Sequence, residues 1–167
     1  MSLIPTLTET LARARADLRM GLPVVIGDHL AAAAETVTPE RMAAMLALGP
    51  AVLALTGWRA ETLKARVYDG DIARIEVPKD ADAGWPLALA DPAGDLMTPM
   101  KGPFRSARGG DVQPHRAAIA LAKSAQLLPA MLMVWHHVRR RHAWKSSLIM
   151  ALTSPASVWL LWGAVWL

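Results

Sequence analysis

Acidic side chains in close succession are the first candidates for chemistry in this sequence. Asp69 and Asp71 flank Gly70, and Glu76 follows in the next apolar segment. Clustered carboxylates suit Mg²⁺ binding and proton transfer, but Asp-Gly-Asp is also typical of a turn. We interpret the pair as a turn. Asp69, Asp71 and Glu76 are the acids that would have to act if the chain were an active enzyme.

Histidines near the C-terminus are the second group of candidates. His136 and His137 are adjacent, and His142 follows five residues after His137. Two metal ligands on one face of a helix are normally four residues apart, and a zinc site needs a third ligand. The run Arg139–Arg141 between them predicts a solvated basic face, without the aromatic residues typical of nucleic-acid binding. We therefore assign no catalytic, cofactor-binding or metal-binding residue, and we expect no cofactor and no nucleic-acid partner.

The elements that must position these residues follow from capping residues and apolar periodicity. Helices are predicted over residues 8–20, 30–35, 38–48, 61–67, 86–90 and 115–128, and strands over 24–26, 51–56 and 72–77. This order predicts an α/β (α+β) fold in which helices pack on a small mixed sheet. Residues 78–114 are rich in proline and glycine and are predicted to be mostly loop.

The composition divides the chain into two segments. Residues 1–100 hold 9 Lys and Arg against 13 Asp and Glu, a net charge of −4, whereas residues 101–167 hold 9 against 1, a net charge of +8. The length of 167 residues suits one domain, and the absence of cysteine excludes disulfides and thiolate zinc sites. We predict a domain over residues 1–130 and a helical tail over 131–167, basic at first and then apolar.

Several short runs resemble one enzyme family, 3,4-dihydroxy-2-butanone 4-phosphate synthase. The similarity covers roughly the first 130 residues, with a poor match over 57–114. The matching runs are Asp17–Gly21, Gly27–Asp28, Ala33–Glu35, Thr38–Glu40, Val52–Thr56 and Ala117–Ala130. The resemblance implies a trimmed synthase fold, a place in riboflavin biosynthesis and a homodimer; an active member would use Mg²⁺.

The departures from the family pattern concern the residues of its chemistry. The acidic loop of the family would fall between Ile26 and Gly27, and Asp28 is the carboxylate that remains there. His115 lies near the family's His-Thr-Glu run, Arg116 stands where a polar residue is expected, and Ala120 replaces an acid. The resemblance therefore implies a pseudoenzyme without synthase activity.

Further runs are similar to the N-terminal, synthase-like part of α-proteobacterial GTP cyclohydrolase II. They are Ala54–Thr56, Leu89–Pro92 and Ala118–Lys123. The zinc-dependent hydrolase half of that enzyme would follow near residue 130 and needs cysteines, which the sequence lacks. The resemblance implies a structural, catalytically inactive and cytoplasmic chain, truncated or frameshifted before the hydrolase half.

Three interpretations of residues 131–167 remain open. A frameshifted end is the one that we favour, because the composition changes abruptly at Met131. A membrane anchor is the second, because Ser146–Leu167 is 22 uncharged residues long, close to the ~20 that span a bilayer, and basic residues precede it. A helix packed on the domain is the third. The anchor interpretation gives the alternative function, a tail-anchored membrane protein with a cytoplasmic α/β domain.

Overall fold

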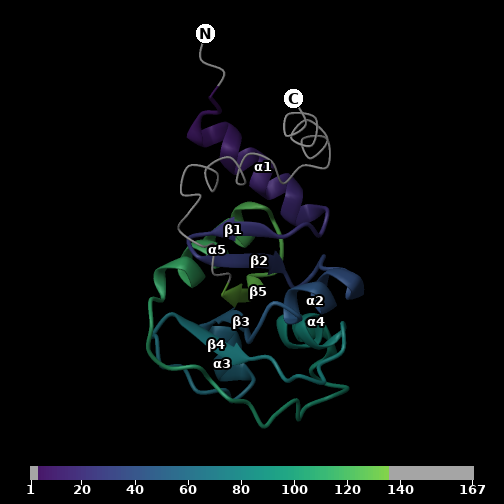
Figure 1. Ribbon diagram of the computed structural model, residues 1–167. Helices are drawn as coiled ribbons and strands as arrows, with labels where there is room; N and C mark the ends of the chain where they lie inside the picture. The colour runs from purple at the N-terminus through teal and green to yellow at the C-terminus, as the bar shows by residue number, and fades with distance from the viewer. Residues whose placement is uncertain (1–3, 136–167) are drawn as a thin grey trace.

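A five-stranded sheet lies at the centre of the computed structural model, which describes residues 4–135 (Figure 1). The strand order is β1-β2-β5-β3-β4, and every pairing is antiparallel. The strands are β1 (Val24–Ile26), β2 (His29–Ala33), β3 (Ala51–Thr56), β4 (Ile72–Glu76) and β5 (Ala130–Trp135). The predicted α/β class is confirmed. The sheet, predicted as mixed, is antiparallel, because β5 comes last in the chain, lies between β2 and β3 and runs opposite to both.

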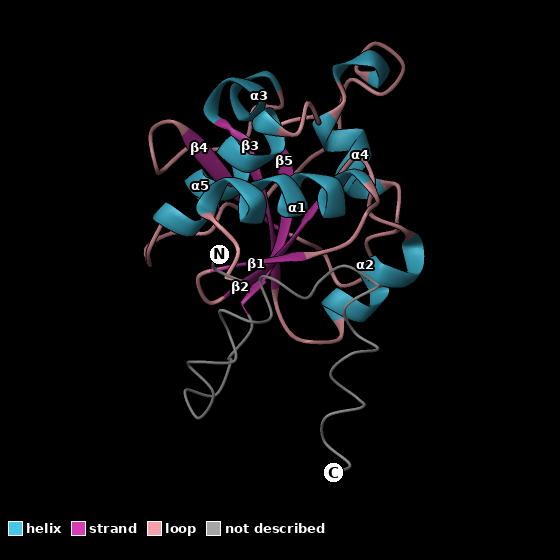
Figure 2. Cartoon of the chain, turned by 90° about the horizontal axis from the view of Figure 1, so that it is seen from above, coloured by secondary structure: helices cyan, strands magenta, loops and turns pink. Residues whose placement is uncertain are grey.

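Helices cover both faces of this sheet, as Figure 2 shows from above. The helices α1 and α5 pack with Ala31, Ala54 and Met133 on one face. The other face packs against α2, α3 and α4 through Leu53, Leu132 and neighbouring apolar side chains. The helices are α1 (Leu7–Arg19), α2 (Pro39–Leu46), α3 (Gly57–Thr62), α4 (Trp85–Ala90) and α5 (Gln113–Ser124), with a 3₁₀ turn η1 (Pro92–Gly94).

Capping side chains fix where two helices begin. Thr6 caps α1 in a capping box, since Glu9 N donates to Thr6 Oγ1 at 3.3 Å and Thr6 N donates to Glu9 Oε2 at 2.7 Å. The helix predicted over 8–20 is confirmed, but it begins after Thr6 and not at Thr8. Thr38 caps α2 by accepting from Arg41 N, so the helix predicted from Thr38 is confirmed.

The alanine-rich segment 30–35 is a strand, and the helix predicted there is wrong. Ala31, Ala32 and Ala33 lie in β2 and are fully buried. All three pair with β5, and Ala31 also pairs with Val24 of β1. Alanine favours helix locally, but its small side chain lets helices pack closely on both faces of the strand, and this tertiary packing overrides the local preference.

The segment Met131–Trp135 continues strand β5, so the helical tail predicted from residue 131 is wrong for these residues. β5 lies between β2 and β3 and is buried along nearly its whole length. Its apolar run is typical of a strand covered on both faces. The rest of the predicted tail lies outside the described residues, together with His136, His137, His142 and the proposed anchor Ser146–Leu167. Within 4–135, no helix has the length and apolar character needed to cross a membrane.

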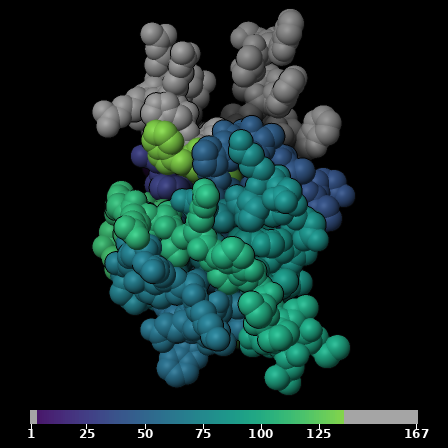
Figure 3. Space-filling view, turned by 90° about the horizontal axis from the view of Figure 1, so that it is seen from below, coloured from purple at the N-terminus to yellow at the C-terminus, as the bar shows by residue number. Residues whose placement is uncertain are grey.

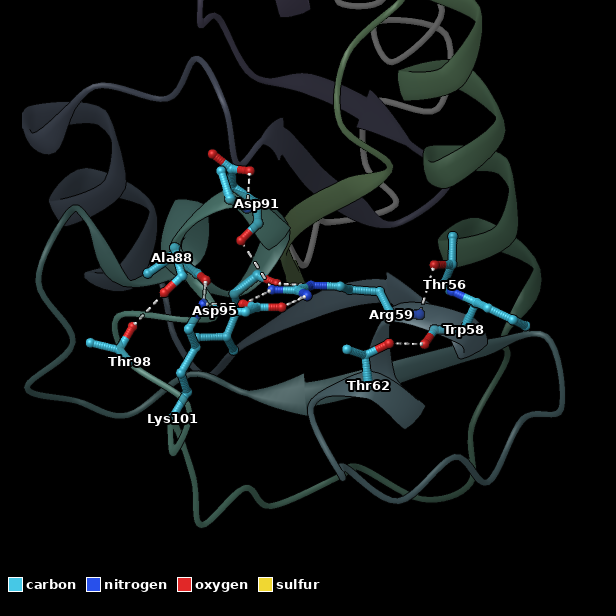
Figure 4. A network of polar contacts seen from close by, with 12 residues as sticks. Thr56, Trp58, Arg59, Thr62, Ala88, Asp91, Asp95, Thr98 and Lys101 are labelled. Atoms are coloured by element: carbon cyan, nitrogen blue, oxygen red, sulfur yellow. Dashed lines mark hydrogen bonds and ion pairs between the residues drawn. The ribbon is translucent and has the colours of Figure 1, made fainter.

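The helix predicted over 61–67 is displaced toward the N-terminus and is α3. Thr56 caps it by accepting from Arg59 N at 3.3 Å. From α3 the buried side chain of Arg59 reaches the α4–η1 region (Figure 4), where it donates to Leu89 O, Asp91 O and both carboxylate oxygens of Asp95. One arginine thus holds the middle of the segment 78–114.

Most of segment 78–114 is loop, as predicted, and it contains the short helix predicted over 86–90. Part of the loop pairs with the outer edge of β4. Glu76 N donates to Arg105 O at 2.8 Å, and Ala107 N donates to Arg74 O at 2.7 Å. We call residues 99–108 the strap. Its backbone satisfies hydrogen-bonding groups that an edge strand would otherwise expose.

Candidate functional site

A tight turn between β1 and β2 lies beside the start of α5. The turn consists of Gly27 and Asp28, with Ile26 paired to His29. Gly27 has φ +59°, which suits the first central position of a type II′ hairpin turn. A Cβ at Gly27 would lie 3.6 Å from Pro114 Cγ, so the turn is in van der Waals range of the first residues of α5. In the resemblance, the missing acidic loop belongs at this turn.

Two histidines meet next to this turn. His29 opens β2 and His115 lies in the first turn of α5, and their ring centroids are 4.9 Å apart in an edge-to-face arrangement. His115 is 3% exposed. The Nδ1 atoms of both rings are buried and have no hydrogen-bond partner among the described residues. Each ring therefore has one buried nitrogen without a hydrogen bond among the described residues, which costs stability.

Burial keeps both imidazoles neutral. Burial, followed by electrostatic repulsion from His29 and Arg74, lowers the pKa of His115 to about 4. The pKa of His29 is also lowered, first by burial and then by Arg74, although Asp28 and Asp111 act in the opposite direction. A neutral imidazole accepts a proton or binds a transition metal. It is a poor ligand for Mg²⁺, which prefers oxygen.

Arginine side chains form ion pairs with both acids of the Asp69–Asp71 turn. Arg74 forms a two-pronged ion pair with Asp69, with Nε to Oδ2 at 2.8 Å and Nη2 to Oδ1 at 3.2 Å, and both side chains are nearly buried. Arg116 of α5 binds Asp71 at 2.8 Å at the surface. Its hydrogen bond with Asp71 lowers the pKa of that carboxyl. These pairs join the β4 side of the sheet to the start of α5.

The acids that the sequence offered for chemistry do not form one metal site. Asp69 and Asp71 are held by separate arginines, and Glu76 is exposed at the far end of β4. Within residues 4–135, no group of three or more acidic, histidine or cysteine side chains is placed to hold a metal ion. The interpretation of Asp69-Gly70-Asp71 as a turn agrees with the structure, since residues 69–71 connect α3 to β4 outside any helix or strand.

Sequence reasoning did not identify His29. The helix predicted over 30–35 hid the hairpin that presents this side chain beside His115. The available signal was Gly27-Asp28 between two short apolar runs, which is typical of a two-residue hairpin turn. For His115 the signal in the sequence is its place near the family's His-Thr-Glu run.

Comparison with known proteins connects this geometry to one fold. No family model matches the chain, and no curated protein matches it. Solved structures do match. A 3,4-dihydroxy-2-butanone 4-phosphate synthase from Candida albicans has a TM-score of 0.51 and 20% identity, over 74% of this chain and 77% of its own. A cation-free synthase of the same name has a TM-score of 0.52 and 22% identity, over 74% and 73%.

The chain has the 3,4-dihydroxy-2-butanone 4-phosphate synthase fold. A third match agrees: RibBX from A. baumannii, a two-domain synthase of the same name, has a TM-score of 0.51 at 17% identity, over 78% of this chain and 48% of that one. At these sequence identities, the similarity shows a shared fold and nothing further. In this synthase-like fold the His29–His115 pair lies beside the β1–β2 turn and the start of α5.

Proposed function

We propose that residues 4–135 form a synthase-like domain of riboflavin biosynthesis that does not itself catalyse the synthase reaction and has a structural role. The fold and the matching runs support the pathway. The observation that carries the inactivity is the two-residue β1–β2 turn, which offers Asp28 as its one carboxylate. Its neighbours are imidazoles and arginine-paired acids, a poor environment for an oxygen-coordinated Mg²⁺ ion.

The chemistry expected of an active synthase needs a different local charge. A metal that organises a sugar phosphate requires several free carboxylate oxygens around it. Here Arg74 and Arg116 pair with Asp69 and Asp71, and Asp28 belongs to no group of three or more possible metal ligands within the described residues. The arrangement favours packing at this corner of the fold over metal binding.

An assay of the full chain with ribulose 5-phosphate and Mg²⁺ tests this proposal. Formate and the butanone phosphate are measured against a no-protein control, with an active synthase as the positive control. We expect no product above the no-protein level. Mg²⁺-dependent product that disappears in an Asp28→Asn variant would overturn the proposal and identify Asp28 as a required acid.

We further propose that the domain is related to the synthase-like part of GTP cyclohydrolase II, where it would support assembly of the zinc-dependent half. The support is the similarity of Ala54–Thr56, Leu89–Pro92 and Ala118–Lys123 to that subgroup. Translation of the encoding DNA in all frames beyond the Trp135 codon tests the relation. A frame that continues into a cysteine-bearing hydrolase half supports it, and the lack of such a frame contradicts it.

A further inference from the structure

We propose that a hollow between the end of α3 and the strap binds a small phosphorylated molecule. The hollow has a volume of about 810 Å³, within the range of ~300–1,000 Å³ common for small-molecule sites. In Figure 3 the blue-teal atoms around α3 and the green atoms near residue 100 form two projections with a depression between them. His29, His115 and Asp28 do not line it, so the inference goes beyond the proposed function.

Positive charge dominates this hollow. Its charged lining residues are five cations and one acid: Lys64, Arg66, Lys101, Arg105, Arg108 and Glu76. Lys101 is paired with Asp95 at 2.6 Å. None of the other four cations forms an ion pair with a carboxylate in residues 4–135. Concave walls lined by one sign of charge concentrate the electrostatic field and attract oppositely charged ligands.

One guanidinium group of the lining is held in place over a phenol ring. The Arg108 guanidinium lies 4.2 Å from the ring centroid of Tyr68 and donates to the Tyr68 hydroxyl. Hydrogen bonds from Arg108 and then Arg66 lower the pKa of Tyr68. Planar guanidinium groups match phosphate oxygens with paired donors. The buried hydroxyl of Ser106, also in the lining, has no hydrogen-bond partner among the described residues.

Apolar side chains form part of the wall of the hollow. Phe104, Pro103, Met100 and Leu63 line it together with the cations. An inorganic anion can bind the cations alone, whereas a phosphorylated organic molecule can also place its carbon skeleton against these apolar groups. Apolar walls with a few charged groups are typical of small-molecule sites.

The backbone of Lys64 is the least expected feature of the lining. Lys64 has φ +57° and follows Leu63, the C-cap residue of α3. Lys64 N donates to Glu61 O at 2.9 Å and Ala65 N donates to Ala60 O at 2.8 Å, the two bonds of a Schellman motif. Glycine is the residue that takes this position without strain. The chain places a lysine there, and a strained residue in a cavity is a candidate for function.

Gln126 provides a matched control for Lys64. It has φ +60° and ends α5 in the same motif, with Gln126 N to Lys123 O at 3.0 Å and Leu127 N to Ala122 O at 3.1 Å. It is exposed and does not line the hollow. Lys64→Gly and Gln126→Gly therefore relieve the same backbone strain, but only the first removes a charge from the proposed site.

Calorimetric titration of inorganic pyrophosphate into the full chain tests the proposal, with thermal unfolding of each variant as the second measurement. We expect the wild-type chain and Gln126→Gly to bind equally. Lys64→Gly should bind about tenfold more weakly or worse, which corresponds to about 1.4 kcal/mol. Both variants should unfold at or above the wild-type temperature, which shows that weaker binding is not misfolding. Arg66→Gln should also weaken binding.

Other outcomes would overturn the proposal. The first is that the wild-type chain does not bind pyrophosphate, and the second is that the two glycine variants bind it equally. The third is that sulfate binds as tightly as pyrophosphate, which indicates a non-specific basic surface. Oligouridylate that binds more tightly than pyrophosphate and depends on Lys64 would make the hollow a nucleic-acid site instead. None of these variants changes Asp28, His29 or His115, so the result is separate from the synthase assay.

Discussion

His115 shows at the scale of one residue how burial changes the chemistry of an imidazole. The structure buries its imidazole at the start of α5, against His29 and within the field of Arg74. A group that must exchange protons near neutral pH needs a pKa near that pH. The pKa of His115 is lowered to about 4. Its environment therefore suits packing better than proton transfer.

The stability of the domain should fall as the pH falls from about 6.5 to about 4. The ordinary pKa of histidine is 6.5 and that of folded His115 is about 4, so the unfolded chain binds more protons in this window. His29, whose pKa is also lowered, contributes in the same direction. Urea unfolding at several pH values should show a smaller loss for His115→Gln than for the wild-type chain.

The pH range in which the histidines change the stability must be separated from the range in which the carboxyl groups do so. The pKa values of Glu9 and Asp71 are lowered from 4.5 and 3.8. Their contributions are present above those ordinary values and are lost as the pH falls below them. Measurements between about pH 5 and 6.5 therefore report the imidazoles. Identical slopes for His115→Gln and the wild-type chain in that range would contradict the predicted role of His115.

At the scale of elements, charged side chains hold loops that have little regular structure. Arg59 connects α3 to α4 and η1, and Asp95 also accepts from Lys101 of the strap. These hydrogen bonds lower the pKa of Asp95, with Arg59 as the larger cause. The long segment 78–114 is therefore ordered by a few polar contacts together with its backbone pairing to β4.

Removal of Arg59 should destabilise the domain much more than removal of an exposed arginine. Arg59→Ala removes the side chain that donates to the buried Leu89 O, and it leaves Asp95 with Lys101 alone. We expect a loss on the order of 2–4 kcal/mol in the free energy of unfolding, measured in urea.

Arg116→Ala is the matched control. It breaks the pair with Asp71, whose side chains are 37% and 60% exposed, and should cost no more than ~1 kcal/mol. Limited proteolysis between α4 and the strap should become faster for Arg59→Ala only. Equal losses for the two variants would mean that the Arg59 contacts do not hold this segment.

At the scale of the whole molecule, β5 holds the two halves of the sheet together. It pairs with β2 on one side and β3 on the other. Met131 and Met133 pack toward α1 and α5, and Leu132 and Val134 pack toward the opposite layer. Both cores depend on residues that come last in the described chain.

Shortening one methionine of β5 should show this dependence. Met133 is 0% exposed and Met97 is 86% exposed, so Met133→Ala and Met97→Ala make the same chemical change in opposite environments. We expect Met133→Ala to lower the free energy of unfolding by ~2–5 kcal/mol through a buried cavity, and Met97→Ala to change it by no more than ~0.5 kcal/mol. Denaturant unfolding measures both. A small loss for Met133→Ala would show that β5 is not part of the cooperative core.

The sequence by itself determined the features with local causes. Thr38 and Pro39 set the start of α2, the turn signals at Gly49-Pro50 and Asp69-Gly70 bounded β3 and β4, and apolar alternation marked β4 as a strand. Together they were enough to predict the α/β class. The runs shared with the synthase family led to the same fold that the solved structures support.

Only the tertiary structure decided the features whose causes are distant in the chain. An alanine run reads locally as helix and becomes β2 because it lies between two strands and two helical layers. The apolar run at 130–135 has no periodicity that separates strand from helix, and its pairing with β2 and β3 makes it β5. The His29–His115 contact and the basic hollow join residues from separate elements, so local sequence patterns do not show that these residues meet.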